Sequence, residues 1–414
     1  MFTFRKLAVA GAAAAALLTG ATARAEEVKL FNDKGFWTNQ LQQVGDVAEK
    51  KTGVRIVPSP YSSPEQYKAF IQSSLSGGSA PDLFTWWTGQ TFNDLVATGQ
   101  IAPLDDVWKD LVASGQYDAS TADLFKVDGK VYAVPLEIAR WVVLYNKDHF
   151  KEVGISEPKT WDDLMAAAEK LKAAGHTPFE ATVQEGWRGF IWFEELMLRT
   201  DPKAYNGLFD GSVAYDSEPV KKAFKLWVDL AAKGYFSDPR SNEEAKDFAS
   251  GKASMYLIGE WAQGIAQAAG MPADKIGAFI TPNLDPKAPS AIIVEGGPLV
   301  VSNAGREKKP VMTALNFWTS ADGASAWAAA SGNYIGNLKA TPPNANITAI
   351  NAAMTANKTV AYQRWWEAVP ADLQGELVAL LNAFELNPTE ANAADTMAKM
   401  QALNAKYWTN KKKN

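Results

Sequence analysis

Tryptophan is the residue type in this chain best suited to a specific chemistry. The 414 residues include fifteen tryptophans but only two histidines, His149 and His176, and no cysteine. Disulfides and thiolate–metal sites are therefore excluded, and two histidines offer little for histidine-based catalysis. An indole ring has a flat apolar face that can stack on the C–H side of a sugar ring. A surplus of tryptophan can also fill a core, so the position of each ring decides between binding and packing.

Two polar and aromatic clusters follow predicted strands near the start of the chain. Asn32-Asp33-Lys34 comes directly after a predicted strand at 28–31, and Trp86-Trp87-Thr88 closes another at 82–87. In open α/β sheets a ligand binds outside the carboxyl ends of the strands, so both clusters are expected at such a rim. An Asp–Lys pair can hold hydroxyl groups through charge-assisted hydrogen bonds. The alternative for Asp33 is an ordinary turn residue.

These clusters must be positioned by alternating strands and helices. Gly53 is suited to end a predicted helix at 36–51, and Ser63-Pro64 to begin the next one. Alternation of this kind predicts a parallel, helix-covered sheet. Asp128-Gly129 suits the turn of a hairpin. Further strands are predicted at 54–57, 141–145, 253–258, 276–280 and 299–302, further helices at 160–175 and 217–233, and a largely helical chain from Glu307 onward.

The length of the chain predicts two lobes. One core rarely supports 414 residues, and 47% hydrophobic residues allow large cores. Neither an internal repeat nor a low-complexity linker is present, so the lobes should be joined by short extended segments. Residues 134–140 and 295–300 are the candidate hinges.

The first 25 residues have the pattern of a secretory signal peptide. Arg5-Lys6 precedes an apolar run at 7–18, and Ala23-Arg24-Ala25 provides a small-x-small cleavage site. The run is short for a bilayer span, although an uncleaved signal anchor is the alternative. Cleavage after Ala25 would change the formal net charge from −5 to −8. A protein with this charge has no electrostatic attraction to nucleic acid, and Lys411-Lys412-Lys413 reads as a solvated tail.

Eight short motifs follow one another along nearly all of the chain after the signal peptide. They are Asn32–Gly35, Glu49–Gly53, Gly78–Asp82, Tyr132–Pro135, Leu144–Asp148, Pro158–Asp163, Gly251–Met255 with Gly259–Trp261, and Gly296-Gly297. Their order resembles that of the bacterial extracellular solute-binding proteins, in particular the maltose/maltodextrin-binding branch.

The resemblance implies an α/β fold with two lobes, the type II periplasmic binding protein fold. Each lobe would be a mostly parallel sheet flanked by helices, joined by a hinge and closing over a ligand. The expected lobes are 26–137 with about 298–340, and 138–297 with about 341–414. The resemblance also implies a monomeric carrier in the periplasm that binds a di- or oligosaccharide or glycoside and delivers it to inner-membrane ABC permease subunits, with no catalytic activity, cofactor or metal.

Particular residues match family positions that contact sugar. Asp33 and Lys34 match polar contacts in the first loop, and Trp86 and Trp261 match the stacking aromatics of the two lobes. The sequence departs from the family at Trp87-Thr88-Gly89 and at 137–141, where the usual acidic residues are missing. The expected ligand-binding residues are Asn32, Asp33, Lys34, Trp86, Trp87, Thr88, Glu137, Arg140, Trp141, Glu185, Trp187, Arg188, Glu260, Trp261, Gly296, Gly297, Arg364 and Trp365. The tryptophans expected in the core are Trp108, Trp161, Trp192, Trp227, Trp318, Trp327 and Trp408. For Trp141, a place in the core is the alternative to ligand binding.

Two alternatives remain open from the sequence. Arg140, Arg188 and Arg364 all adjoin tryptophans and could bind a sulfonate or uronate in the same fold. A secreted glycoside-cleaving enzyme would instead need two carboxylates about 5 Å or 6.5–9.5 Å apart. Asp33, Glu137, Glu185 and Glu260 are the candidates for such a pair, but no motif marks a nucleophile or an acid.

Overall fold

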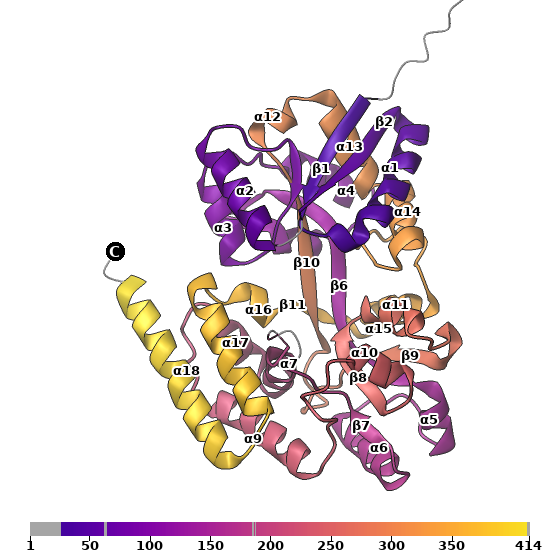
Figure 1. Ribbon diagram of the computed structural model, residues 1–414, viewed down its shortest axis with the longest axis vertical. Coiled ribbons are helices and arrows are strands. Elements are labelled where there is room, and N and C mark those ends of the chain that lie inside the picture. The colour runs from indigo at the N-terminus through magenta and orange to yellow at the C-terminus, as the bar shows by residue number, and fades with distance from the viewer. Residues whose placement is uncertain (1–25, 62–63, 184–185, 187, 412–414) are drawn as a thin grey trace, which may run out of the picture.

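The protein has two lobes, each with its own hydrophobic core (Figure 1). The computed structural model describes residues 26–61, 64–183, 186 and 188–411. Core side chains of the upper lobe in Figure 1 come from 28–138 and 299–340, and those of the lower lobe from 141–294 and 350–400. The predicted α/β fold with two lobes is therefore confirmed. The predicted residue limits of the lobes stay a prediction, because the two cores assign the buried residues to a lobe but not the segments between them.

The upper lobe is built on a parallel sheet. β1 (Glu26–Asn32) pairs in parallel with β2 (Val54–Pro60) and β3 (Leu83–Thr85), as the alternation predicted. Gly53 has φ 77° and ends the first helix, and Gly45 lies so close to β2 that a Cβ atom would be 2.0 Å from the Ile56 carbonyl oxygen. The helices of this lobe are α1 (Thr38–Thr52), α2 (Pro64–Ser76), α3 (Gln90–Ala97), α4 (Asp105–Ala113), α12 (Asn303–Arg306), α13 (Lys309–Thr319) and α14 (Ala321–Ser331), with a hairpin of β4 (Lys126–Val127) and β5 (Lys130–Val131).

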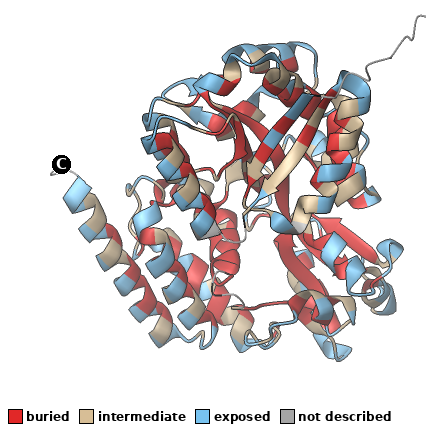
Figure 2. Ribbon diagram, turned by 45° about the horizontal axis from the view of Figure 1, so that its top comes forward, coloured by how far each residue is buried: buried red, intermediate tan, exposed pale blue. Residues whose placement is uncertain are grey.

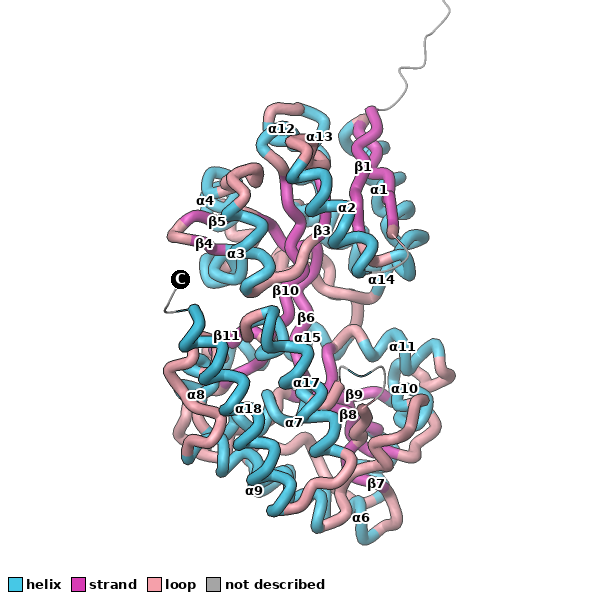
Figure 3. The backbone as a smooth tube through the Cα atoms, turned by 60° about the vertical axis from the view of Figure 1, so that its left-hand side comes forward, coloured by secondary structure: helices cyan, strands magenta, loops and turns pink. Residues whose placement is uncertain are grey.

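Two long antiparallel strands cross between the lobes (Figures 1 and 3). They are β6 (Ala133–Asn146) and β10 (Ala291–Val301), and they contain the predicted hinge segments 134–140 and 295–300. The sequence analysis expected separate strands at 141–145 and 299–302, and this was wrong: each is one end of a crossing strand. Pro135 and Gly296-Gly297 resemble turn residues in the sequence, but here they lie in paired strands with one register shift between Gly297 and Pro298.

The lower lobe joins the same sheet through the other ends of the crossing strands. β8 (Ala253–Gly259) and β9 (Ile276–Phe279) both pair with β6, and β7 (Thr177–Phe179) pairs with β8. Strand β11 (Val360–Gln363) pairs with β10 and was not predicted within the helical tail. The helices are α5 (Lys147–Glu152), α6 (Trp161–Ala173), α7 (Phe190–Thr200), α8 (Pro202–Gly207), α9 (Glu218–Ala232), α10 (Glu244–Ala249), α11 (Ala262–Ala268), α15 (Ala345–Asn357), α16 (Trp365–Ala368), α17 (Ala371–Glu385) and α18 (Glu390–Lys411).

Most of the tryptophans expected in the core are there. Trp108, Trp161, Trp192, Trp227, Trp318 and Trp327 are buried, whereas Trp408 near the end of α18 is only partly buried. Buried residues follow the strands and the inner faces of the helices in both lobes (Figure 2). Among the helices of the described residues, none combines the length and hydrophobicity needed to cross a membrane.

Candidate ligand-binding site

The carboxyl ends of strands from both lobes converge on the middle of the crossing strands. In the upper lobe, β3 ends where Thr85 pairs with Leu299 of β10. In the lower lobe, β8 ends where Gly259 pairs with Trp141 of β6. The residues that follow these strands therefore lie at the junction of the lobes. This is where a ligand site is expected in open α/β folds.

The first loop supplies a charged pair to this junction. Asp33 Oδ1 accepts a hydrogen bond from the Thr85 hydroxyl (3.2 Å) and lies 3.5 Å from Lys34 Nζ. Both side chains are partly buried. Asn32, expected to contact ligand, is fully buried: its side chain donates to the Leu30 carbonyl and accepts from the Lys34 backbone N–H. Asn32 shapes the turn that presents Asp33 and Lys34.

The second loop presents a different tryptophan from the one expected to stack. Trp86 is only 4% exposed and its indole N–H donates to the Thr91 carbonyl (3.0 Å), so it belongs to the upper core. Trp87 is half-buried and packs edge-on against Trp86, with ring centroids 4.9 Å apart. The ring with an accessible face in this loop is therefore Trp87. Thr88 is buried.

Glu137 is a buried carboxyl group on β6. It is 6% exposed, and one oxygen accepts a hydrogen bond from the side-chain amide of Asn333 (3.2 Å). Burial raises the pKa of Glu137 to about 8, although Lys34 lowers it; the negative charge of Glu295 raises it further. Glu137, Lys34 and Glu295 are therefore close enough to influence one another's ionisation. Gly297 pairs with Glu137, and a Cβ atom on Gly297 would lie 3.4 Å from Glu137 Cγ, so the Glu137 side chain packs against this glycine.

Arg364 connects the C-terminal part of the chain to this junction. Its guanidinium forms ion pairs with Glu295 (2.9 Å) and Glu367 (3.3 Å) and lies over the ring of Trp366, 4.9 Å from its centroid. Trp366 is half-buried, whereas Trp365 is fully buried and donates its indole N–H to the Tyr215 hydroxyl. The expected ligand role of Trp365 is thus contradicted by its place in the lower core.

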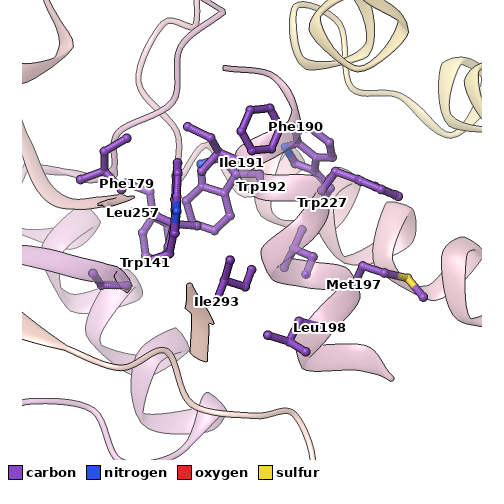
Figure 4. Close-up of a cluster of buried hydrophobic side chains, with 14 of the residues drawn as sticks. Trp141, Phe179, Phe190, Ile191, Trp192, Met197, Leu198, Trp227, Leu257 and Ile293 are labelled. Carbon is purple, nitrogen blue, oxygen red and sulfur yellow. The ribbon is translucent and has the colours of Figure 1, made fainter. Parts of the chain in front are cut away.

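Trp141 also lies in the lower core. It is 1% exposed, and Figure 4 shows it among Phe190, Trp192 and Ile293. The core alternative for this residue therefore describes it better than the ligand-binding one. Its contact with the junction is through the Arg364 guanidinium, 5.6 Å from its ring centroid.

A second buried ion pair lies on β6. Arg140 Nε lies 3.0 and 3.1 Å from the two carboxylate oxygens of Glu260, and a terminal nitrogen lies 2.8 Å from one of them. The guanidinium also donates to Asn351 and lies 4.8 Å from the centre of the Tyr334 ring. Burial raises the pKa of Glu260, and the positive charge of Arg140 lowers it. Arg140 and Glu260 hold each other in place, which favours a structural role for both over direct contact with a ligand.

The lower lobe contributes Trp261 directly after this pair. Trp261 is half-buried, and its indole nitrogen lies over Gly259, where a Cβ atom would be 2.1 Å away. Two further expected residues, Glu185 and Trp187, lie outside the described residues. Arg188 is buried, paired with Glu244 (2.7 Å) and bonded to the Tyr256 hydroxyl (3.0 Å), so it anchors its loop.

The structure thus brings together part of the predicted set and adds residues that were missed. Asp33, Lys34, Glu137 and Arg364 share one electrostatic cluster. Among the described residues, no group of three His, Cys, Asp or Glu side chains is arranged to hold a metal ion. The added residues are Glu295, Asn333, Trp366 and Glu367, of which only Trp366 had a signal in the sequence, as the neighbour of Arg364-Trp365.

Comparisons with known proteins agree with this architecture. The sequence model of the bacterial extracellular solute-binding proteins matches residues 36–325. An uncharacterised ABC transporter extracellular-binding protein of Pyrococcus horikoshii is 31% identical over 49% of this chain and 47% of its own length. The α-glucosides-binding periplasmic protein AglE of Rhizobium meliloti is 34% identical over 45% of this chain and 43% of its own.

The match to solved structures is more extensive. The chain spans about half the length of the curated relatives it matches. By contrast, the bacterial solute receptor AcbH, which prefers β-D-galactopyranose, superposes with a TM-score of 0.78 at 21% identity and covers 92% of this chain and 99% of its own. Sequence and fold agree: the chain belongs to the bacterial extracellular solute-binding protein family.

Proposed function

We propose that this protein is a periplasmic carrier that binds an uncharged di- or oligosaccharide or glycoside between its lobes. It closes on the sugar and delivers it to the permease of an ABC importer. The observation that supports this proposal is that three half-buried indoles, Trp87, Trp261 and Trp366, follow strands that end at the lobe junction, where Asp33, Lys34 and Glu137 share one electrostatic cluster. Sugar-binding relatives such as AglE and AcbH support the ligand class.

The three indoles are suited to a stacking role because they are neither buried nor fully exposed. They come from three separate segments, one in the upper lobe and two in the lower, so a ligand between them would contact both lobes. Stacking supplies apolar contact with the C–H faces of sugar rings, while the Asp33 carboxylate accepts hydrogen bonds from hydroxyl groups. The carboxyl group of Glu137, whose pKa burial raises to about 8, can also donate one. A combination of this kind supports affinity of about micromolar strength.

The charge arrangement favours an uncharged sugar over an acidic one. Each arginine that suggested a sulfonate or uronate already has a carboxylate partner: Arg140 has Glu260, Arg188 has Glu244, and Arg364 has Glu295 and Glu367. An anion would have to compete with those carboxylates and would approach the Asp33 carboxylate as well. We therefore propose no anionic ligand.

We also propose that the protein has no glycosidase activity. Glu260 is held by Arg140 through both carboxylate oxygens, so it is not free to act as a nucleophile or as a general acid. Hydrolysis of oligosaccharides by the purified protein would contradict this.

A ligand screen with matched variants tests the binding proposal. Thermal melting is measured with uncharged mono- to tetrasaccharides and with uronates and sulfonated sugars, because a bound ligand raises the melting temperature. Calorimetry then gives Kd for the mature protein, Trp261→Ala and Trp408→Ala. Trp408 is a half-buried tryptophan on α18 whose indole packs over Gly211 and donates to the Asn404 side chain, so its substitution should leave Kd unchanged. Tight binding of an acidic sugar alone, or equal loss of affinity in both variants, would refute the proposal.

A further inference from the structure

The two lobes touch beside crossing strand β10, where the loop after β3 meets α16. Gly89, in the loop after β3, has φ +78°, and a Cβ atom built on it would lie 1.5 Å from the carbonyl oxygen of Glu367 and 2.6 Å from its carbonyl carbon. This contact therefore joins backbone to backbone. Neighbouring Trp86 and Phe92 belong to the upper core, and Trp365 and Val369, on either side of Glu367, belong to the lower core. The contact thus bridges the two lobes.

Side-chain groups at the same point reinforce the contact. Glu367 is 6% exposed, and burial raises the pKa of its carboxyl group, which the nearby Thr88 hydroxyl and Gly296 backbone N–H lower, although the Thr88 hydroxyl makes no hydrogen bond of ordinary geometry. Arg364 holds the same carboxylate from the lower lobe at 3.3 Å. Glu367 is therefore contacted from the upper lobe by Thr88, from a crossing strand by Gly296, and from its own lobe by Arg364.

Beside this contact the lobes are separated. A groove of about 430 Å³ lies between Gln90 and Asp94 of α3 in the upper lobe and residues of α17 and α18 in the lower lobe, among them Asp372 and Lys411. Figure 1 shows the end of α18 reaching toward α3 along this side of the molecule. Since the groove lies open between α3 and the two C-terminal helices, the contact at Gly89 is local.

We propose that Gly89, Thr88 and Glu367 form a latch that holds the lobes in the arrangement seen here and sets how readily they separate. Glycine is needed at position 89 because any side chain would push the Glu367 backbone away. The latch residues are positioning residues: they act on the ligand through the distance between the lobes. The ligand-affinity part of this inference rests on the proposed function, whereas the lobe separation can be measured without any ligand.

The inference follows from how two-state equilibria couple to binding. A ligand that contacts both lobes binds only when they are together, so its apparent affinity falls with the population of that arrangement. Breaking the latch should open the unliganded protein and weaken ligand binding on the order of tenfold, within the usual range of such coupling.

Double electron–electron resonance between two spin labels, one on each lobe, measures how far apart the lobes lie. The chain has no cysteine, so Ser73→Cys on α2 and Ala398→Cys on α18, both exposed, give one label in each lobe. The distance is compared in the parent, in Gly89→Ala and in Gly99→Ala. Gly99 has φ +71° with nothing within 4 Å of a Cβ atom, so it reproduces the backbone strain without the clash. Thr88→Val removes the hydroxyl without altering a left-handed residue and serves if Gly89→Ala does not fold.

The expected result is a longer label distance in unliganded Gly89→Ala and Thr88→Val than in the parent and Gly99→Ala. A saturating uncharged sugar identified in the screen should restore the shorter distance. If the Gly89 and Thr88 variants keep the parent distance, or lose affinity without any change in distance, the latch is refuted. If they open but no variant binds any sugar, the proposed function fails and the latch stands.

Discussion

Breaking the Arg140–Glu260 ion pair should destabilise the fold in a way that depends on which partner is removed. Both side chains are almost fully buried, 3% and 5% exposed, and three nitrogen–oxygen distances of 2.8–3.1 Å join them. Removing one partner of such a pair usually costs about 3–5 kcal/mol, because the other charge stays buried without compensation. Replacing both with apolar residues can be nearly neutral.

The two single substitutions differ because only one of the remaining groups can lose its charge. In Arg140→Met, Glu260 can take up a proton, and from its ordinary pKa of 4.5 this costs about 3.4 kcal/mol at pH 7 but only about 0.7 kcal/mol at pH 5. The folded-state pKa of Glu260 is then above its unfolded value, so stability is lost as pH rises. In Glu260→Met, Arg140 cannot lose its proton and keeps only Asn351 and the Tyr334 ring.

Urea unfolding of the parent, both single variants and the double variant at pH 5 and pH 7 tests this reasoning. Arg140→Met should cost about 2–3 kcal/mol less at pH 5 than at pH 7, whereas the cost of Glu260→Met should change little between them. The double variant should be more stable than either single variant at pH 7. Costs that simply add in the double variant, or a cost of Arg140→Met that is the same at both pH values, would refute the reasoning.

Four more substitutions separate burial, charge and ligand contact. In urea unfolding, Glu137→Gln should be more stable than the parent, and the difference in unfolding free energy should grow by on the order of 4 kcal/mol from pH 5 to pH 9. Because the folded-state pKa of Glu137 is about 8, the parent loses stability as pH rises from 4.5 through 8. A difference that stays constant with pH would contradict this. Trp365→Ala should lose about 3–5 kcal/mol of stability, because its ring is fully buried. Trp366→Ala should lose less stability but weaken sugar binding, measured by calorimetry, at least about tenfold. A larger loss of stability in Trp366→Ala than in Trp365→Ala would contradict the assignment of Trp365 to the core. His149 stacks on His176 with ring centroids 3.8 Å apart, and its pKa is lowered by burial and then by His176. Its contribution to stability is therefore present above pH 6.5 and lost as pH falls. His149→Gln should flatten the decline in melting temperature between pH 7 and pH 5, and an unchanged slope would contradict this.

Local patterns in the sequence were sufficient for the elements whose signals are local. The parallel strands β1 and β2 and the helix end at Gly53 follow from alternation and from glycine's tolerance of positive φ. The crossing strands could not be recognised as continuous, because Pro135 and Gly296-Gly297 have turn chemistry and only pairing between β6 and β10 makes them strand residues. Strand β11 likewise depends on its partner β10.

Site residues could be predicted from the sequence where they directly follow the end of a strand. They could not be predicted where two adjacent tryptophans occur and only one of them faces the core. Asp33, Lys34 and Trp261 lie where the strands predict. Within Trp86-Trp87 and Trp365-Trp366, however, the sequence cannot tell which ring faces the core. Adjacent residues in a loop or a short helix point in different directions, and the ring that is buried donates its indole N–H to a partner, Trp86 to the Thr91 carbonyl and Trp365 to the Tyr215 hydroxyl. In both pairs the second tryptophan is the half-buried one.

The pairing of charges at the junction bears on how this protein distinguishes ligands. Arg140 and Arg364 form ion pairs with Glu260, Glu295 and Glu367 before any ligand arrives, so these groups are already compensated. A ligand that used them would have to break strong buried pairs, at a cost of several kcal/mol each. Under the proposed function, recognition is then left to groups that gain contact without breaking such a pair, among them the indoles of Trp87, Trp261 and Trp366. On that proposal, their apolar faces would fit the ring of an uncharged sugar, and the paired charges around them would give an anion no free cation to bind.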